Sequence, residues 1–155
     1  MRHNERLAVP WWLWLVGLAL AALFAAELHL GAPGVRSWLP YAVVLPATAA
    51  GLWLLGRLRV AVGAGSFRVD DASLPVRCVA GVTVLGPAEK RLLLGPAAHP
   101  YAFVVQRPWV PGAVQVHLDD PDDPTPYWVV SSRRPAALAA AVLAERDAAT
   151  TLPPR

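Results

Sequence analysis

The chain has 155 residues, of which 55% are apolar and only 16% are charged. This composition is too hydrophobic for a disordered tail, and the length suits one compact unit with an attachment better than several large domains. The formal charge of +3 comes from 13 arginines and one lysine spread along the sequence, whereas nucleic-acid binding requires a clustered basic stripe. We therefore predict no nucleic-acid partner.

Two long uncharged stretches dominate the first third of the chain. Residues 11–30 contain no charge before Glu27, and as a helix rising 1.5 Å per residue they would cover about 30 Å, the thickness of the hydrocarbon core of a bilayer. Residues 38–56 are also uncharged, and we expect Pro46 to bend a helix there. The external turn, residues 31–37, is so short that the helices must return antiparallel. The sequence therefore predicts a hairpin of two transmembrane helices.

Basic residues at the ends of these stretches predict the orientation of the hairpin. Two arginines precede the first span and two follow the second, whereas the turn contains one: Arg2 and Arg6, then Arg57 and Arg59, with Arg36 between. Because cytoplasmic edges carry the excess of basic residues, we expect both termini, including residues 1–10, to be cytoplasmic. The protein would then be a multi-pass protein of the inner membrane, with the lipid bilayer as its first partner.

Small residues at four-residue spacing predict the faces along which the two helices pack. They are Gly17, Ala21 and Ala25 on the first helix, and Ala47 and Gly51 on the second.

A cleaved signal peptide is the alternative for residues 11–30, because a basic start precedes an apolar, alanine-rich centre. The length of the stretch, its tryptophans and the second span close behind it favour a retained hairpin.

After Arg57 the sequence changes to short apolar stretches separated by glycine and proline, which is typical of strands. Seven stretches qualify: RLRVAV, SFRV, LPVRCV, GVTVL, AFVVQ, AVQVHL and YWVVS. They predict a small antiparallel all-β barrel or sandwich over residues 57–149. We expect hairpin turns at Gly-Ala-Gly, residues 63–65, and at Pro111-Gly112.

The chain ends in an alanine-rich segment that we expect to form a helix starting at Pro135. Leu138 and Val142 would lie on one face of this helix, which could then close the open side of a barrel. Residues 150–155 read as a frayed tail. Cys78, the only cysteine, excludes an internal disulfide and reads as a small apolar residue in a strand.

Several motifs taken together resemble domain of unknown function family 3093, small two-span membrane proteins of actinobacteria. The motifs are Glu5-Arg6, PWWLW, ELHLGAPG, RPW and DDPDDPTPYW. The resemblance covers nearly the whole chain and implies a place in the membrane, but it supplies no activity, ligand or catalytic residue. The succession of strands and one last helix also resembles bacterial pleckstrin-homology-like domains found next to membrane spans.

The acidic stretch before residue 127 is the first candidate site, with Asp119, Asp120, Asp122 and Asp123. Carboxylates suit a hard cation, but the calcium-loop spacing is absent, and aspartate with proline is ordinary turn chemistry. We expect a solvated loop between two outer strands that points away from the membrane, with contact to a basic partner as the alternative.

Glu27 and His29 form the second candidate, because an ionisable residue within a span is a functional hypothesis by default. Both lie near the outer end of the span, where water or an ion pair between Glu27 and Arg36 could solvate them. A structural clasp and an external ligand, proton or partner site both stay open.

Four residues could together bind a phosphate or an acidic peptide: Arg107, Trp109, Arg133 and Arg134. Trp128 offers a second stacking surface beside Trp109. In the simpler alternative the arginines pair with the aspartate loop or with water, and both tryptophans belong to the core. We find no catalytic motif, no metal-ligand spacing and no cofactor motif in the sequence.

The sequence therefore favours a non-enzymatic membrane protein whose cytoplasmic module contacts lipid head groups or an unidentified protein partner, and it leaves the oligomeric state open. The alternative is a membrane-bound enzyme, or an enzyme subunit, that uses the Asp119–Asp123 loop or Glu27 and His29.

Overall fold

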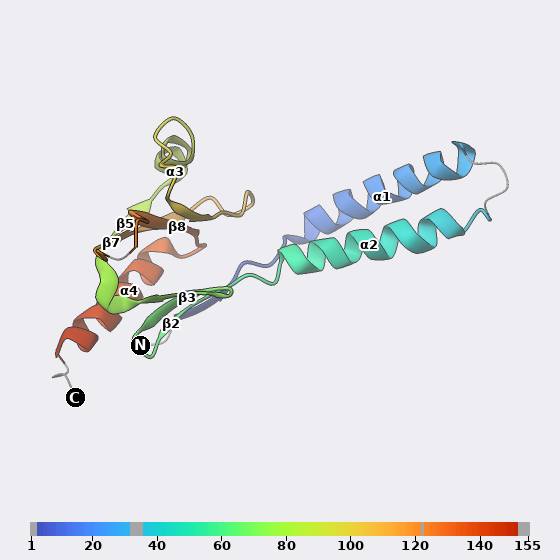
Figure 1. Cartoon of the computed structure of the whole chain (residues 1–155). Helices are drawn as coiled ribbons and strands as arrows, with labels where there is room; N and C mark the ends of the chain where they lie inside the picture. The colour runs from blue at the N-terminus through green and yellow to red at the C-terminus, as the bar shows by residue number, and fades with distance from the viewer. Residues whose placement is uncertain (1–2, 32–35, 122, 152–155) are drawn as a thin grey trace. The chain divides into compact units, whose positions relative to one another are not determined.

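The computed structural model describes residues 3–31, 36–121 and 123–151 (Figure 1). The chain divides into two compact units. Unit 1 joins Met1–Leu7 to Arg59–Arg155, and unit 2 is Ala8–Leu58. The sequence suggested a separate N-terminal segment over residues 1–10, but the first part of that segment belongs to the strand-rich unit.

Unit 2 consists of two apolar helices that pack along each other in opposite directions (Figure 1). They are α1 (Trp11–Gly31) and α2 (Leu39–Leu55), and α2 accommodates Pro46 in its interior. Among the described residues, α1 is the one helix that is both long and apolar enough to cross a bilayer, whereas α2 has 17 residues and is shorter. Residues 32–35 of the predicted turn lie outside the described residues.

The packing face predicted for α1 is confirmed, but the face predicted for α2 is wrong. Ala21 and Ala25 are buried, and a Cβ on Gly17 would lie 3.1 Å from Leu52 Cδ1. By contrast, Ala47 is exposed and nothing lies within 4 Å of a Cβ on Gly51. The half-buried side of α2 is instead marked by residues at three- and four-residue spacing: Leu45, Thr48, Ala49 and Leu52. Larger side chains of α2 thus meet the small residues of α1.

Sheet A of unit 1 is an antiparallel meander. Its four strands, in spatial order, are β1 (His3–Arg6), β2 (Arg59–Gly63), β3 (Ser66–Val69) and β4 (Ala72–Pro75). The hairpin turn predicted between β2 and β3 is confirmed, because Ala64 and Gly65 have the positive φ values, 53° and 71°, that a type I′ turn requires. Strand β1 was not predicted, because HNER carries no alternation of apolar side chains.

Sheet B has four strands in the order β5-β7-β8-β6: β5 (Val79–Leu85), β7 (Ala113–Leu118), β8 (Tyr127–Ser131) and β6 (Phe103–Val105). The short 3₁₀ helix η1 (Val76–Cys78) links the two sheets, so the predicted strand LPVRCV is divided after Pro75. Strand β6 runs parallel to β8, which corrects the expectation of a purely antiparallel fold. The predicted hairpin turn at Pro111-Gly112 is also wrong, because β8 lies between β6 and β7 in the sheet.

Helix α3 (Pro87–Leu94) lies between β5 and β6 in sequence and was not predicted. Its first turn is capped by Glu89, whose Oε2 accepts a hydrogen bond of 2.7 Å from the Gly86 N–H. Leu93 and Leu94 of α3 pack against three buried residues of sheet B: Leu85, Ala113 and Val129. One face of sheet B is therefore covered by this helix.

The main core of unit 1 lies between the two sheets and the C-terminal helix α4 (Pro135–Thr151) (Figure 1). The rings of Phe67 in sheet A and Trp128 in sheet B lie 6.1 Å apart, and α4 contacts strands of both sheets. Leu138 and Val142 are fully buried, as predicted. The helix continues to Thr151, beyond the predicted start of the frayed tail, and residues 152–155 lie outside the described part.

Glu5 on β1 ties the first strand to the segment that leads into α4. Its Oε2 accepts a hydrogen bond of 2.6 Å from Ser132 Oγ, and its Oε1 accepts one of 2.6 Å from the Arg133 N–H. Ser132 Oγ in turn accepts a hydrogen bond from the Arg134 N–H. The Glu5 side chain is only 10% exposed, and Ser132 is fully buried. The carboxylate therefore joins two segments that are more than 120 residues apart.

We expect Glu5→Ala to destabilise unit 1 by about 1–3 kcal/mol, because it leaves the Ser132 hydroxyl and the Arg133 N–H without their acceptor. Thermal melting of the full chain in mild detergent measures the effect. The control is Asp147→Ala, which removes a largely exposed carboxylate paired with Arg146 and should change little. Equal effects of the two substitutions would contradict the role given to Glu5.

We also expect Gly112→Ala to destabilise unit 1 by roughly 1–3 kcal/mol, because the added Cβ is overpacked. It would lie 2.9 Å from the Ser132 carbonyl oxygen and 3.0 Å from Pro135. The matched control is Gly81→Ala, since nothing lies within 4 Å of a Cβ there. The same melting assay should place this control within about 0.5 kcal/mol of the parent chain. A tolerated Gly112→Ala would refute the close approach.

Candidate functional site

The aspartate loop connects β7 to β8 and is closed by local hydrogen bonds. The Leu118 N–H donates to the Pro126 carbonyl over 3.1 Å, and Asp123 Oδ1 accepts from the Thr125 N–H over 2.8 Å. Asp119 and Asp123 are exposed, as expected for a solvated loop. Its two flanking strands, however, are the central strands of sheet B and not outer ones. Asp122 lies outside the described residues.

Two groups at this loop, Asp123 and Cys78, have pKa values that local contacts shift. Hydrogen bonds from Thr125 hold the pKa of Asp123 below its usual range, whereas a general acid at neutral pH needs a raised pKa. Burial, followed by the hydrogen bond with Asp120, raises the pKa of the Cys78 thiol, which keeps it protonated and poorly nucleophilic. Within the described residues, no group of three His, Cys, Asp or Glu side chains is placed to hold a metal ion.

Glu27 and His29 lie in the last part of α1. The Glu27 side chain is exposed and His29 is half-buried. The clasp between Glu27 and Arg36 that the sequence suggested is not formed: the described residues contain no ion pair between them. Glu27 lies a full turn before the end of α1 at Gly31, whereas Arg36 follows the connecting residues.

The structure brings the four residues of the predicted phosphate or peptide site to one end of sheet B. Since β6 and β8 are parallel, Arg107 follows β6 at the same edge where Arg133 and Arg134 follow β8, and the Arg107 N–H donates to Ser131 Oγ over 3.0 Å. The Arg107 guanidinium carbon lies 5.9 Å from the centroid of the Trp109 ring. The aspartate loop precedes β8, so it lies at the opposite end of this strand from the arginines.

The structure adds a residue that the sequence analysis passed over: Lys90, the only lysine of the chain. Its side chain extends from α3 and the residue is only 6% exposed. The ammonium group donates to the Val110 carbonyl over 2.7 Å and to Ser131 Oγ over 3.0 Å. Both acceptors are neutral, and no carboxylate among the described residues forms an ion pair with Lys90. Burial lowers the pKa of this group from its ordinary value of 10.5.

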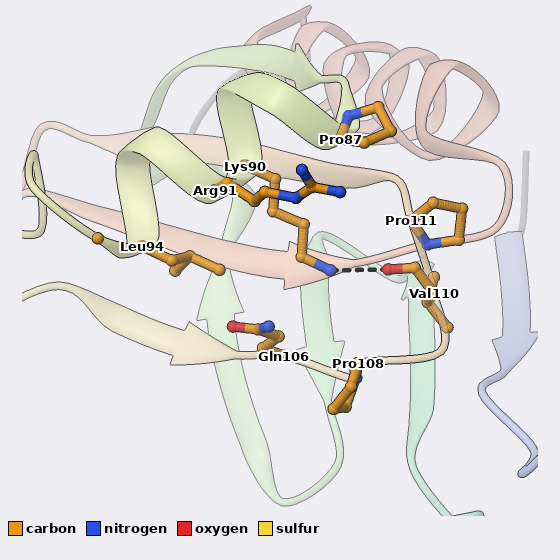
Figure 2. A pocket seen from close by; sticks show the side chains of 9 residues that line it. Pro87, Lys90, Arg91, Leu94, Gln106, Pro108, Val110 and Pro111 are labelled. Carbon is orange, nitrogen blue, oxygen red and sulfur yellow. Dashed lines mark hydrogen bonds between the residues drawn. The ribbon is translucent and has the colours of Figure 1, made fainter.

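A surface pocket of about 430 Å³ opens beside this lysine, which we call the Lys90 pocket. Figure 2 shows Lys90 and Arg91 extending from α3 toward the chain segment that carries Val110 and Pro111. The remaining lining residues come from α3, from the residue directly after it and from the loop after β6: Pro87, Leu94, Gly95, Gln106 and Pro108. Two cationic side chains and one amide thus line a pocket whose other walls are mostly proline and aliphatic.

A signal for Lys90 was present in the sequence. In a chain with 13 arginines, a single lysine is conspicuous. On a helix, Lys90 shares a face with Leu93 and Leu94 at positions i+3 and i+4, so it occupies a place where an apolar residue is usual. No element was predicted for this segment, and the relation between the three residues exists only in a helix.

Burial of the charged Lys90 ammonium group lowers the stability of the folded chain, and we expect this loss of stability to shrink as the pH rises. The lowered pKa means that the folded chain releases this proton at a lower pH than the unfolded chain does. The cost is therefore full below the folded pKa and is relieved as the pH rises from that value toward 10.5. The charged residues around Lys90 are Arg91 on α3, Arg107, whose backbone N–H donates to Ser131 Oγ, and Glu89. The Glu89 carboxylate accepts a hydrogen bond from the Gly86 N–H.

The melting temperatures of the parent chain and of Lys90→Met, compared in detergent from neutral to alkaline pH, measure this change. We expect the melting temperature of the parent chain to rise relative to that of Lys90→Met over this range. A difference between the two that does not vary with pH would contradict a charged, buried Lys90.

Comparison with known proteins identifies a family. Residues 2–142 match the family described as "Protein of unknown function (DUF3093)". No curated protein and no solved structure matches the chain. The match includes both units, from β1 through α1, α2 and the two sheets into α4. Because it covers most of the sequence, the chain belongs to the family Protein of unknown function (DUF3093).

Proposed function

We propose that this is a non-enzymatic, integral protein of the inner membrane, in which α1 and α2 cross the bilayer as a hairpin and unit 1 is a cytoplasmic binding module. One observation carries the proposal: the large apolar side chains of unit 2 are exposed while unit 1 has a complete core of its own. Only 11% of the apolar stretch of α1 is buried, although a helix in the core of a water-soluble protein would be mostly buried.

The exposed apolar side chains are spread along both helices, as lipid contact would require. They include Trp11, Trp12, Leu15, Leu20, Leu23, Phe24, Leu39, Val43, Trp53 and Leu54. A soluble protein rarely exposes an apolar surface of this extent. Helices also satisfy their own backbone hydrogen bonds, which a segment within the bilayer must do.

The pairing of β1 with β2 supports two crossings and not one. β1 precedes α1 and β2 follows α2, and the two strands are hydrogen-bonded from His3 opposite Val62 to Arg6 opposite Arg59. The two ends of unit 2 must therefore return to the same side of a membrane. A bilayer crossed by α1 has to be crossed back by α2, and 17 residues lie at the lower limit of spanning length.

The same pairing argues against a cleaved signal peptide. Removal of the chain through α1 would also remove β1, the buried Leu7 and the Glu5 carboxylate that holds Ser132 and Arg133. At the other end of unit 2, the Arg57 guanidinium carbon lies 4.6 Å from the Trp53 ring centroid, a pair that suits the cytoplasmic interface.

For unit 1 we propose a pleckstrin-homology-like arrangement that contacts lipid head groups or a protein partner. Two packed sheets closed by a C-terminal helix support this arrangement. The parallel pairing of β6 with β8 and the helix α3 are features that the predicted arrangement did not contain. A fragment from residue 57 onward lacks β1 and Glu5, so assays of partner binding require the full chain.

We predict that the chain resists alkaline carbonate extraction and that its connecting turn faces outward. The single cysteine allows a direct test in Cys78→Ser, to which one new cysteine is added. Ser37→Cys, next to α2, should react with a membrane-impermeant maleimide in intact spheroplasts. Asp147→Cys, on α4, should react only after the membrane is opened.

Two results would overturn this topology. One is release of the chain by carbonate, which would indicate that unit 2 does not enter the bilayer. The other is labelling of Ser37→Cys and Asp147→Cys under the same condition, which would place the turn and unit 1 on one side of the membrane.

A further inference from the structure

The buried ammonium group of Lys90 has no negative partner within the described part of the chain. Lys90 is 6% exposed, and its two hydrogen-bond acceptors, the Val110 carbonyl and Ser131 Oγ, are neutral. Burial of an uncompensated charge is costly, and such groups are usually paired. The one acid of α3, Glu89, is bound to the Gly86 N–H and does not line the Lys90 pocket.

Donors remain available on the wall of the Lys90 pocket. An ammonium group has three N–H bonds, and the described residues accept from it at Val110 and Ser131. Arg91 is exposed, and its guanidinium group makes no hydrogen bond or ion pair with the described residues. Gln106 adds an amide. Two cations without an acidic lining residue give the pocket a positive potential.

The shape and lining of the pocket restrict what could bind there. A volume of about 430 Å³ falls in the range of small-molecule sites. Pro87, Pro108 and Pro111 have restricted backbones, so this part of the wall is largely formed before a ligand arrives. Leu94, which is half-buried, supplies aliphatic surface. A metal cation does not suit a pocket lined by two positive side chains.

We propose that the Lys90 pocket binds a small molecule through an oxyanion, a carboxylate or a phosphate, contacted by the Lys90 ammonium and the Arg91 guanidinium. The planar guanidinium group matches the geometry of such oxyanions with two parallel hydrogen bonds. The apolar part of the ligand lies against Leu94 and the exposed prolines. This inference depends on unit 1 alone and holds whether or not unit 2 spans a membrane.

The unique lysine gives the proposal a direct assay in the full chain. Lys90 carries the only side-chain amine, so mass spectrometry of the Lys90 peptide reports its rate of modification by an amine reagent. The soluble probes are butyrate, butyl phosphate and inorganic phosphate, with methyl butyrate as the uncharged control. We expect a charged probe near saturation to slow the modification of Lys90 about fivefold or more, because the rate falls with the fraction of the protein that has the probe bound. We expect the ester to have no effect.

Arg91→Gln tests the contact with the oxyanion, and Arg68→Gln, an exposed arginine on β3, is the matched control. Loss of a charge-assisted hydrogen bond should weaken protection by the charged probe about 10- to 100-fold in Arg91→Gln. The control should resemble the parent chain. Melting temperatures of both variants verify that they are folded.

A second arm distinguishes a free ligand from a lipid head group. The chain is placed in nanodiscs of phosphatidylcholine alone or mixed with phosphatidylglycerol. Protection of Lys90 by phosphatidylglycerol, dependent on Arg91, assigns the oxyanion to a lipid, and protection by the soluble probes alone assigns it to a small metabolite. The proposal is overturned when no charged probe or lipid protects Lys90, when the ester protects equally, or when Arg91→Gln behaves like Arg68→Gln.

Discussion

The antiparallel pairing of β1 with β2 is the constraint on which the organisation of this protein depends. It joins a strand that precedes the two apolar helices to a strand that follows them. The chain therefore leaves sheet A before unit 2 and returns to the same sheet after it. Glu5 strengthens this closure, because its carboxylate accepts hydrogen bonds from the segment before α4. The N-terminus is thereby part of the strand-rich unit. Both ends of the helical pair therefore connect to neighbouring strands of sheet A.

A second constraint is the position of β8 between two covering layers. Trp128 and Val130 lie on the side of the core that Phe67 and α4 complete, and Val129 lies on the side that α3 covers. Ser131 follows Val129 on this second side and is fully buried, which gives the Lys90 ammonium and the Arg107 N–H a common acceptor. Lys90 and Ser131 thus form a buried polar pair beside the apolar cluster of Leu85, Ala113 and Val129. The Lys90 pocket forms where this layer reaches the surface.

The sequence predicted the local features well where the pattern is continuous. The apolar length of residues 11–30, the turn at Ala64-Gly65, the strand AVQVHL and the buried face of α4 are all seen in the structure. It failed where pairing is non-local: HNER has no strand pattern, and Pro111-Gly112 has turn residues without a hairpin. The same distinction holds for the candidate site residues at one end of sheet B. Arg107 and Trp109 were identified by residue type, whereas Lys90 was not.

By itself, the sequence determined the two apolar stretches, the strand-rich character of the remainder and the family, because each of these depends on composition, periodicity or motif along the chain. Only the tertiary structure decided the strand order β5-β7-β8-β6, the return of β1 to β2 and the burial of Lys90. These depend on which distant segments come together. The ammonium group of Lys90 meets Val110 and Ser131 from 20 and 41 residues away, and no local pattern encodes that meeting.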